Sequence, residues 1–292
     1  MTNVNDRFNR KWLIEKAVDV LSNYTDGITI RQLYYRLVSV HGMTNDERHY
    51  KRADAAIVAA RWSGVIQFDQ IIDRERAMSG HTEADEKNLD EAIETGKEQV
   101  RAWMENYRLE RWSNQPHYVE VWIEKKALQG VFENPCREYR LGLGPCKGYS
   151  SLTFLYDAKL RFKEASKRGK ALHILYFGDY DPSGKDIPRS LQQNILRMGV
   201  NVDVHHIALN QVQINAMGLP GVPPKITDSR TKNWTGGDVV ELDAVEPKTL
   251  EQMCRDEIKK YFDKNIYQVL IEQEASERVK YQQALKEYVS GL

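Results

Sequence analysis

The chain has 292 residues, and its 42 basic and 42 acidic residues cancel to a formal net charge of zero. This length is sufficient for two domains that each bury a core. The balanced charge excludes a protein that holds nucleic acid through a global excess of basic residues, so any such surface has to be local.

The composition also argues against secreted and membrane proteins. The three cysteines, Cys136, Cys146 and Cys254, lack a metal-binding spacing and are odd in number, which favours reduced thiols. The first residues carry no apolar signal-peptide core, and no window approaches ~18 consecutive apolar residues. We therefore expect a cytoplasmic protein without a membrane-spanning segment.

The first part of the chain is expected to form three helices. Apolar residues recur at helical spacing over 9–24, 30–41 and 50–62, and a short strand is expected over 65–68. Thr29 is suited to cap the second helix, since its side chain can accept a hydrogen bond from the first turn. Three helices followed by a small β element is the order of a winged-helix module.

Two adjacent tyrosines on the second helix are expected to differ in their surroundings. At ~100° per residue, Tyr34 falls beside the apolar Leu33 and Leu37. Tyr35 falls on the other side together with Arg31, one turn away, and should be presented outward. Periodicity fits a Tyr35 that only covers surface. The alternative is a nucleophile, because Arg31 would help to stabilise a phenolate whose ordinary pKa is ~10.

Basic side chains in and after the third helix are candidate phosphate contacts. They are Lys51, Arg52, Arg61, Arg74 and Arg76. Acidic residues lie in the same stretch, so the pattern is equally typical of an ordinary solvated face. An acidic helical stretch follows over 82–111, with Leu89, Ile93, Val100 and Trp103 as its apolar stripe. We expect this stretch to connect two domains.

The second half alternates predicted strands and helices. Strands are expected over 117–123, 171–177 and 201–209, with helices over 152–168 and up to about 198 between them. Two long helices, over 247–263 and 265–289, close the chain. This alternation is typical of an α/β fold with a mostly parallel sheet.

Carboxylates follow two of these strands. Glu124 ends the first apolar run, and Asp179 and Asp181 follow the second. The i, i+2 spacing turns Asp179 and Asp181 to one side, and ligands bind at the carboxyl ends of strands in open α/β sheets. If the two strands are neighbours, all three carboxylates can hold one Mg²⁺ or Mn²⁺ ion through oxygen. Glu124 is alternatively suited to act as general acid or base.

Taken alone, an Asp-x-Asp pair is also typical of an ordinary acidic turn. A phosphate-binding P-loop is excluded, because five residues and not four separate Gly178 from Gly184, and Asp186 replaces the Ser or Thr. His205 and His206 are expected to be strand residues, since no Cys or carboxylate cluster completes a zinc set nearby.

The second half resembles a TOPRIM domain, the metal-binding module of topoisomerases, bacterial primases and some nucleases. VWIEKKAL at 121–128 supplies its Glu, and FGDYDPSG at 177–184 supplies its Asp-x-Asp pair. CKGYSS at 146–151, VVELDAVEPKTLEQM at 239–253 and RQLYYRL at 31–37 extend the resemblance to the A subunit of topoisomerase VI and the meiotic double-strand-break transesterase. The resemblance covers roughly 10–80 and 117–262, and is closest to minimal, stand-alone relatives of the A subunit.

The resemblance implies a domain organisation and a set of site residues. An N-terminal winged-helix (CAP-like) domain with a helical connector is expected over 1–112, and a TOPRIM domain with C-terminal helices over 113–292. Tyr35 would be the nucleophile, with Arg31 and Glu124 as catalytic partners. The metal ligands would be Glu124, Asp179 and Asp181. Lys125 and Lys147 join the candidate DNA contacts.

The activity implied is that of a type IIB topoisomerase-like transesterase. In the presence of Mg²⁺ or Mn²⁺, Tyr35 would cleave double-stranded DNA and form a 5′-phosphotyrosyl link. One alternative is a TOPRIM nuclease that uses activated water without a covalent intermediate, and another is a DNA-binding protein with a degenerate site.

The resemblance also implies partners and a location. We expect a homodimer with composite sites, because the connector has to separate Tyr35 from the carboxylates and the family joins the tyrosine of one subunit to the metal of the other. Two copies would also place a nucleophile on each DNA strand. A separate ATPase subunit is compatible with the sequence. The location would be the cytoplasm, in association with the nucleoid if the source is bacterial or archaeal.

Overall fold

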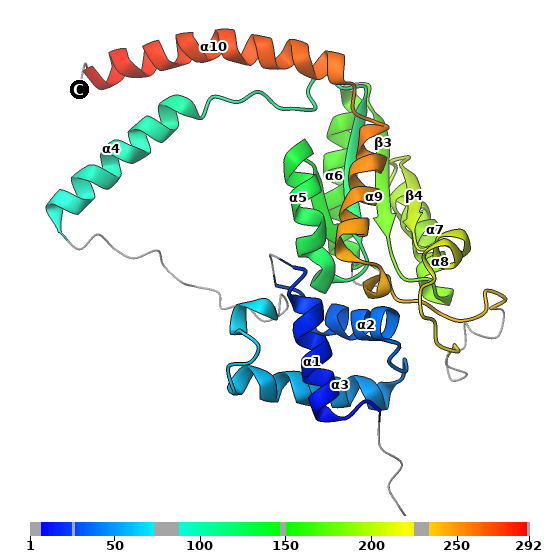
Figure 1. Ribbon diagram of the computed structural model, residues 1–292. Helices are drawn as coiled ribbons and strands as arrows, with labels where there is room; N and C mark the ends of the chain where they lie inside the picture. The colour runs from blue at the N-terminus through cyan, green and yellow to red at the C-terminus, as the bar shows by residue number, and fades with distance from the viewer. Residues whose placement is uncertain (1–6, 25–26, 73–87, 147–149, 225–233, 291–292) are drawn as a thin grey trace, which may run out of the picture.

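The computed structural model describes residues 7–24, 27–72, 88–146, 150–224 and 234–290 (Figure 1). Its first elements are α1 (Arg10–Leu21), α2 (Ile30–His41) and α3 (Glu47–Trp62). Thr29 caps α2 as expected, because its side chain accepts a hydrogen bond from the Gln32 amide while the Gln32 side chain accepts one from the Thr29 amide. These helices pack around fully buried aliphatic side chains such as Leu33, Leu37 and Ile57.

The short strand expected over 65–68 is wrong. A 3₁₀ turn, η1 (Phe68–Gln70), follows α3 instead, and the strand-like pairing nearby is one isolated bridge between Ile28 and Ile71. The amides of Val65 and Ile66 both donate to the Ala60 carbonyl at the end of α3, at 3.0 and 3.3 Å. They therefore complete the helix terminus and are not available to a strand partner. Residues 73–87 lie outside the described residues, so the winged-helix assignment stays a prediction.

The acidic connector forms α4 (Leu89–Glu105), which buries none of its residues. The expected apolar stripe is solvent-exposed at Leu89, Ile93 and Trp103. Figure 1 shows α4 and the last helix, α10 (Lys264–Ser290), extending away from the sheet. The segment after α4 is held to α10 by the buried Glu274, whose carboxylate accepts hydrogen bonds from the Leu109 amide and the Arg111 guanidinium.

A four-stranded parallel sheet forms the centre of the second half, which confirms the α/β class. Its strands are β1 (His117–Ile123), β2 (Gly142–Pro145), β3 (Ala171–Phe177) and β4 (Asp203–Ala208), in the order β2-β1-β3-β4. The crossovers are α5 (Gln129–Tyr139), α6 (Leu152–Lys167) and α7 (Pro182–Arg197), and α8 (Gln211–Met217) follows β4. Within the described residues, no helix is long and apolar enough to cross a membrane.

Side chains alternate between the two faces of this sheet. Odd-numbered strand residues such as Val121 and Phe177 belong to a core that includes residues of α5 and of α9 (Pro247–Lys259). Even-numbered residues such as Trp122 and Tyr176 belong to a second core, formed with α6 and α7. In β1 and β3, sequence position therefore tells which face a side chain lies on. The alternation does not hold to the end of β4, where Ala208 belongs to the first core, because the register of β3 and β4 shifts between Tyr176 and Phe177.

Candidate active site

Glu124 and the Asp-x-Asp segment meet because β1 and β3 end at the same level. Ile123 lies opposite Phe177 in the parallel register, and the Glu124 amide donates to the Phe177 carbonyl at 2.9 Å. The Glu124 Oε2 atom accepts hydrogen bonds from the Asp179 amide at 3.0 Å and the Tyr176 hydroxyl at 3.1 Å. The carboxylate of Glu124 is therefore held against the backbone of Asp179.

Two glycines permit this close packing. A Cβ atom on Gly178 would lie 2.5 Å from the Tyr176 hydroxyl and 2.7 Å from Glu124 Oε2. A Cβ atom on Gly184 would lie 2.1 Å from the Asp179 carbonyl oxygen. Asp181 then begins α7 as its N-cap, and its Oδ1 atom accepts a hydrogen bond from the Gly184 amide at 2.6 Å. Its carboxylate is thereby placed at the start of the helix.

Lys125 is surrounded by acidic side chains. Its ammonium lies 2.9 Å from Asp179 Oδ2, 3.1 Å from Glu241 Oε2 and 3.0 Å from Asp243 Oδ2. An ammonium has three donors, so these carboxylates can use all of them. Burial opposes the charge, but the acidic neighbours outweigh it and raise the pKa of Lys125. The candidate DNA contact Lys125 thus faces carboxylates in this structure.

Burial changes the acidity of the predicted metal ligands. Asp179 is 8% exposed, and burial, opposed by Lys125 and reinforced by Glu124, raises its pKa to about 7. Burial also raises the pKa of Glu124, and the neighbouring Asp181 carboxylate adds to the effect. Crowded carboxylates with raised pKa values gain stability when a cation is added.

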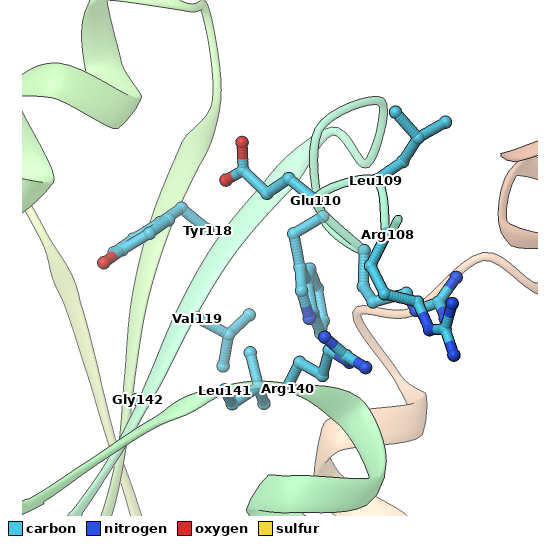
Figure 2. Close-up of a pocket in the computed structure, with 10 residues that line it drawn as sticks. Arg108, Leu109, Glu110, Tyr118, Val119, Arg140, Leu141 and Gly142 are labelled. Atoms are coloured by element: carbon cyan, nitrogen blue, oxygen red, sulfur yellow. The ribbon is translucent and has the colours of Figure 1, made fainter. Parts of the chain in front are cut away.

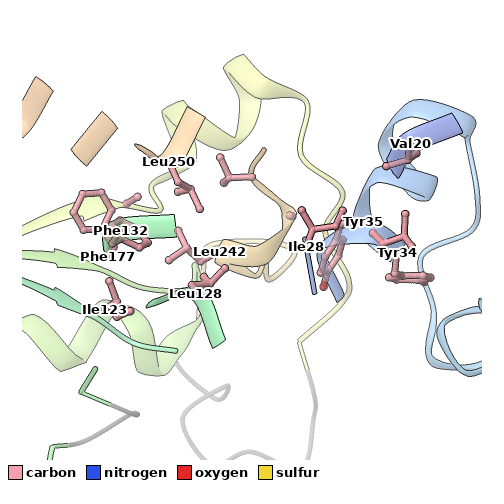
Figure 3. Close-up of a cluster of buried hydrophobic side chains, with 14 of the residues drawn as sticks. Val20, Ile28, Tyr34, Tyr35, Ile123, Leu128, Phe132, Phe177, Leu242 and Leu250 are labelled. Atoms are coloured by element: carbon pink, nitrogen blue, oxygen red, sulfur yellow. The ribbon is translucent and has the colours of Figure 1, made fainter. Parts of the chain in front are cut away.

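Tyr35 is not presented outward as expected. Only 6% of the residue is exposed, and Figure 3 shows it on the side of α2 that faces the segment carrying Leu242. Burial, reinforced by Glu241, raises the pKa of the Tyr35 phenol well above its ordinary value, although Arg31 and Lys125 act in the opposite direction. The Arg31 charge therefore does not lower the pKa of Tyr35 enough to offset the effect of burial. The helical pattern missed this because a second element covers α2.

The covering element is the 3₁₀ turn η4 (Leu242–Ala244) with Glu241 before it. Arg31 donates a hydrogen bond to Glu241 Oε1, and Arg36 donates one to the Ala244 carbonyl. Glu241 also accepts the hydrogen bond from Lys125, so it joins α2 to the carboxylate cluster within one chain. The expectation that the connector separates Tyr35 from the carboxylates is therefore wrong.

Glu241 and Asp243 are site residues that were missing from the predicted set. Asp243 is 1% exposed, and the amide of the residue between them, Leu242, donates to Asp179 Oδ1 at 2.7 Å. Burial raises the pKa of Glu241, but Lys125 and Arg31 outweigh it and the resulting pKa lies below the ordinary value. The signal in the sequence was the Glu-Leu-Asp run at 241–243, which the resemblance singled out without a role.

The candidate DNA contacts on α3 have partners within the protein. Lys51 lies 2.8 Å from Glu47, and Arg52 and Arg61 donate to the carbonyls of Phe8 and Phe68 at 3.0 and 3.2 Å. Arg74, Arg76 and Lys147 lie outside the described residues. Contact of these six side chains with phosphate stays a prediction.

A cavity of about 490 Å³ lies apart from this site, where the segment 108–112 passes the beginning of β1 (Figure 2). Its lining includes Arg108, Arg140 and Val119. Val119 is near the amino end of β1, whereas Glu124 follows the carboxyl end. The cavity is therefore separate from the carboxylates.

The sheet carries a second group of polar side chains. The ligand atoms of His173, Asp203 and His205 all lie within 4.8 Å of one another, so this group can hold a metal ion. His205 and His206 are strand residues of β4, as expected. The expectation that no Cys or carboxylate cluster completes a metal set nearby is wrong for His205. It failed because the nearest ligand, His173, lies on another strand, and the pairing of β3 with β4 brings the two together.

No protein-family model matches this chain, and no curated protein or solved structure is significantly similar to it.

Proposed function

We propose that this chain is a Mg²⁺- or Mn²⁺-dependent DNA-cleaving enzyme in which Tyr35 is the nucleophile. The observation that supports this is the junction of α2 with the carboxylate cluster, where Glu241 binds both Arg31 and Lys125. A phenol, a guanidinium and several carboxylates in one place are the groups that phosphoryl transfer to a tyrosine requires. Together with the TOPRIM-like motifs, this arrangement favours a transesterase.

The metal ligands would be Glu124, Asp179 and Asp181. The donor set fits a hard cation because it consists of carboxylate oxygens. Glu124 and Asp179 have raised pKa values, and a bound cation would stabilise their ionised forms. When bound, the ion would neutralise charge on the phosphate. Asp179 Oδ2 lies 2.9 Å from the Lys125 ammonium and Oδ1 accepts from the Leu242 amide, and each oxygen keeps a second lone pair for the ion.

In the proposed reaction the Tyr35 oxygen bonds to phosphorus while the bond from phosphorus to the 3′ oxygen breaks. The phenol loses its proton to a base and the departing 3′ oxygen gains one. Because burial raises the pKa of the phenol, attack needs such a base. Glu124, whose pKa burial also raises, would take that role instead of binding the metal, which Asp179 and Asp181 would then hold. Arg31 would stabilise the charge on the phosphate.

Tyr35 has to become accessible before it can reach DNA. At 6% exposure the residue is covered, and the contact of α2 with η4 is what covers it. A phosphate competes with Glu241 for Arg31, since both are anions. We propose that DNA opens this contact. A homodimer would place two nucleophiles on opposite strands for a double-strand cut, with or without an ATPase subunit. It would act in the cytoplasm, at the nucleoid if the cell is bacterial or archaeal.

The decisive experiment compares Tyr35→Phe with Tyr34→Phe on end-labelled duplex DNA with Mg²⁺. We expect Tyr35→Phe to abolish both cleavage and the covalent protein–DNA adduct, because it removes the attacking oxygen. Tyr34→Phe is the matched control on the same helix, since the Tyr34 hydroxyl is occupied by hydrogen bonds to the carbonyls of Thr44 and Asp46. It should retain the adduct.

A hydrolytic nuclease is the second candidate. The observation that favours it is the covered Tyr35 phenol with its raised pKa, which a water nucleophile would not need to use. In that case Tyr35→Phe cuts DNA as well as the unmodified chain, and no covalent adduct forms with either. That result would overturn the transesterase proposal and retain the metal site. Protein that binds DNA without cutting it under any metal condition would overturn both.

A further inference from the structure

We propose that the chain binds one zinc-class divalent ion at the amino ends of β3 and β4, through His173, Asp203 and His205. This site is separate from the proposed cleavage site. His173 lies near the amino end of β3 (Ala171–Phe177), whereas Asp179 follows its carboxyl end. Four strand positions separate His173 from Phe177, which at ~3.3 Å per residue corresponds to about 13 Å.

The topology of the sheet brings these ligands together. His173 lies opposite Asp203 in the parallel register of β3 and β4, and His205 follows two positions later. Side chains two positions apart in a strand share a face, so all three residues project from one face of the sheet. His173 is buried, His205 is partly exposed and Asp203 is exposed, which leaves the site open to solvent on the Asp203 side.

The distances are close to those around a single small cation. His173 Nδ1 lies 3.1 Å from His205 Nε2 and 3.9 Å from an oxygen of Asp203. Two nitrogen ligands at zinc distances of ~2.0–2.1 Å and a tetrahedral angle are about 3.3 Å apart. Two ligand atoms 3.9 Å apart can still contact one ion between them. Small side-chain shifts are therefore sufficient to bind the metal.

The surroundings hold His173 in the orientation that binding needs. Its other ring nitrogen, Nε2, lies 3.0 Å from His117 Nδ1 on the neighbouring strand. In the tautomer whose Nε2 donates to His117, Nδ1 carries no proton and is turned towards Asp203 and His205. Metal-bound histidines commonly have such a partner on the second nitrogen. The ring of Tyr261 packs on His173, with ring centroids 4.5 Å apart, and limits its rotation.

The ligand types select the class of metal. Two imidazole nitrogens and one carboxylate oxygen favour Zn²⁺ and neighbouring transition metals over Mg²⁺, which prefers oxygen ligands only. β4 is the last strand in the sheet order, and the ion would join it to β3 by a link that does not depend on the hydrogen-bond ladder. We infer that the ion stabilises this edge of the sheet.

The test is metal binding by the full chain, without a polyhistidine tag that would bind the same ions. Chelator-treated protein is titrated with Co²⁺, which replaces Zn²⁺ and reports histidine ligation by its visible absorption, in excess Mg²⁺ to occupy the carboxylate site. We expect one Co²⁺ per chain that Zn²⁺ displaces. Asp203→Asn and His205→Gln should each weaken binding by ~10-fold or more. At equal Zn²⁺ concentration, the melting temperature of the unmodified chain should rise more than that of Asp203→Asn.

His49→Gln is the control for the loss of one imidazole, because His49 lies on α3 with Asp46 as its partner. It should leave Co²⁺ binding unchanged. Asp179→Asn should also retain it, whatever that variant does to DNA cleavage, which separates this proposal from the proposed function. Absence of Co²⁺ binding, or equal binding by the unmodified chain and Asp203→Asn, would overturn the proposal. Asp203 is exposed, so its replacement by Asn should leave folding intact.

Discussion

At the scale of single residues, Asp179 has an acidity that can be measured. Burial raises its pKa from 3.8 to about 7 in the metal-free chain. Between these values the folded chain holds a proton that the unfolded chain has lost. Protonated Asp179 therefore contributes to the free energy of unfolding. This contribution is complete below about pH 3.8 and is lost as the pH rises through about 7.

We therefore predict that Asp179→Asn flattens the pH dependence of stability. In the metal-free chain, Asp179 should lower the free energy of unfolding by up to ~1.4 kcal/mol per pH unit as the pH rises towards 7. Asn keeps an acceptor for the Leu242 amide but cannot ionise. Urea unfolding at several pH values, with a chelator present, measures the difference. Parallel curves for the two proteins would show that Asp179 has the same pKa in the folded and the unfolded chain, which would contradict the prediction.

A second prediction concerns Gly178. A Cβ atom there would approach the Tyr176 hydroxyl to 2.5 Å and Glu124 Oε2 to 2.7 Å, so Gly178→Ala should displace Glu124. We expect a loss of stability of ~1–3 kcal/mol and weaker Mg²⁺ binding by calorimetry. Gly96→Ala is the matched control, because nothing lies within 4 Å of its added atom and α4 should gain up to ~1 kcal/mol. Unchanged Mg²⁺ affinity in a folded Gly178→Ala chain would argue against Glu124 as a ligand.

At the scale of elements, the contact of α2 with η4 determines the state of Tyr35. Arg31 and Arg36 both donate hydrogen bonds from α2 to this segment. Burial is the main cause of the raised pKa of the Tyr35 phenol, and the Glu241 carboxylate raises it further. One side chain thus links the acidity of the proposed nucleophile to the packing of two elements.

We predict that Glu241→Gln lowers the pKa of Tyr35, because it removes a negative charge and keeps the shape of the side chain. NMR titration of ¹³C-labelled tyrosines measures this, with the Tyr35 signal assigned by its absence in Tyr35→Phe. Glu138→Gln is the control, since Glu138 is exposed and paired with Arg255 at 3.0 Å. It should leave the Tyr35 titration unchanged. A Tyr35 pKa that does not move in Glu241→Gln would mean that the two groups do not interact.

At the scale of the whole molecule, the contact between the two halves of one chain bears on how the proposed homodimer would assemble its sites. One chain already brings Tyr35 beside Glu241, which binds Lys125 at the carboxylate cluster. The family that the motifs resemble combines the tyrosine of one subunit with the metal site of the other. These arrangements differ in a mixing experiment.

We predict that a mixture of Tyr35→Phe and Asp179→Ala chains stays inactive, because each chain assembles its own site and each variant lacks one part. Fluorescence exchange between labelled chains has to show first that subunits exchange. Recovery of single-strand nicks in the mixture would show composite sites, and would mean that DNA separates α2 from η4 and passes Tyr35 to the partner. A mixture of unmodified and Tyr35→Phe chains serves as the positive control.

Much of the local structure was determined by the sequence alone. The strands β1 and β3, the helices α6, α9 and α10 and the cap at Thr29 form where periodicity and capping chemistry predicted them. These features depend on neighbours within a few positions, which a sequence displays directly. The level ends of β1 and β3 then brought Glu124 to Asp179, as two adjacent parallel strands require.

The tertiary structure decided what covers each element. Tyr35 is buried because residues 241–244, about two hundred positions away, pack on α2. His173 and Asp203 meet because β3 pairs with β4 in one particular register. The expected strand at 65–68 did not form because its amides complete the end of α3. Periodicity specifies which face of an element is apolar. Which distant segment packs on its other face depends on tertiary contacts, and these cannot be read from a local sequence pattern.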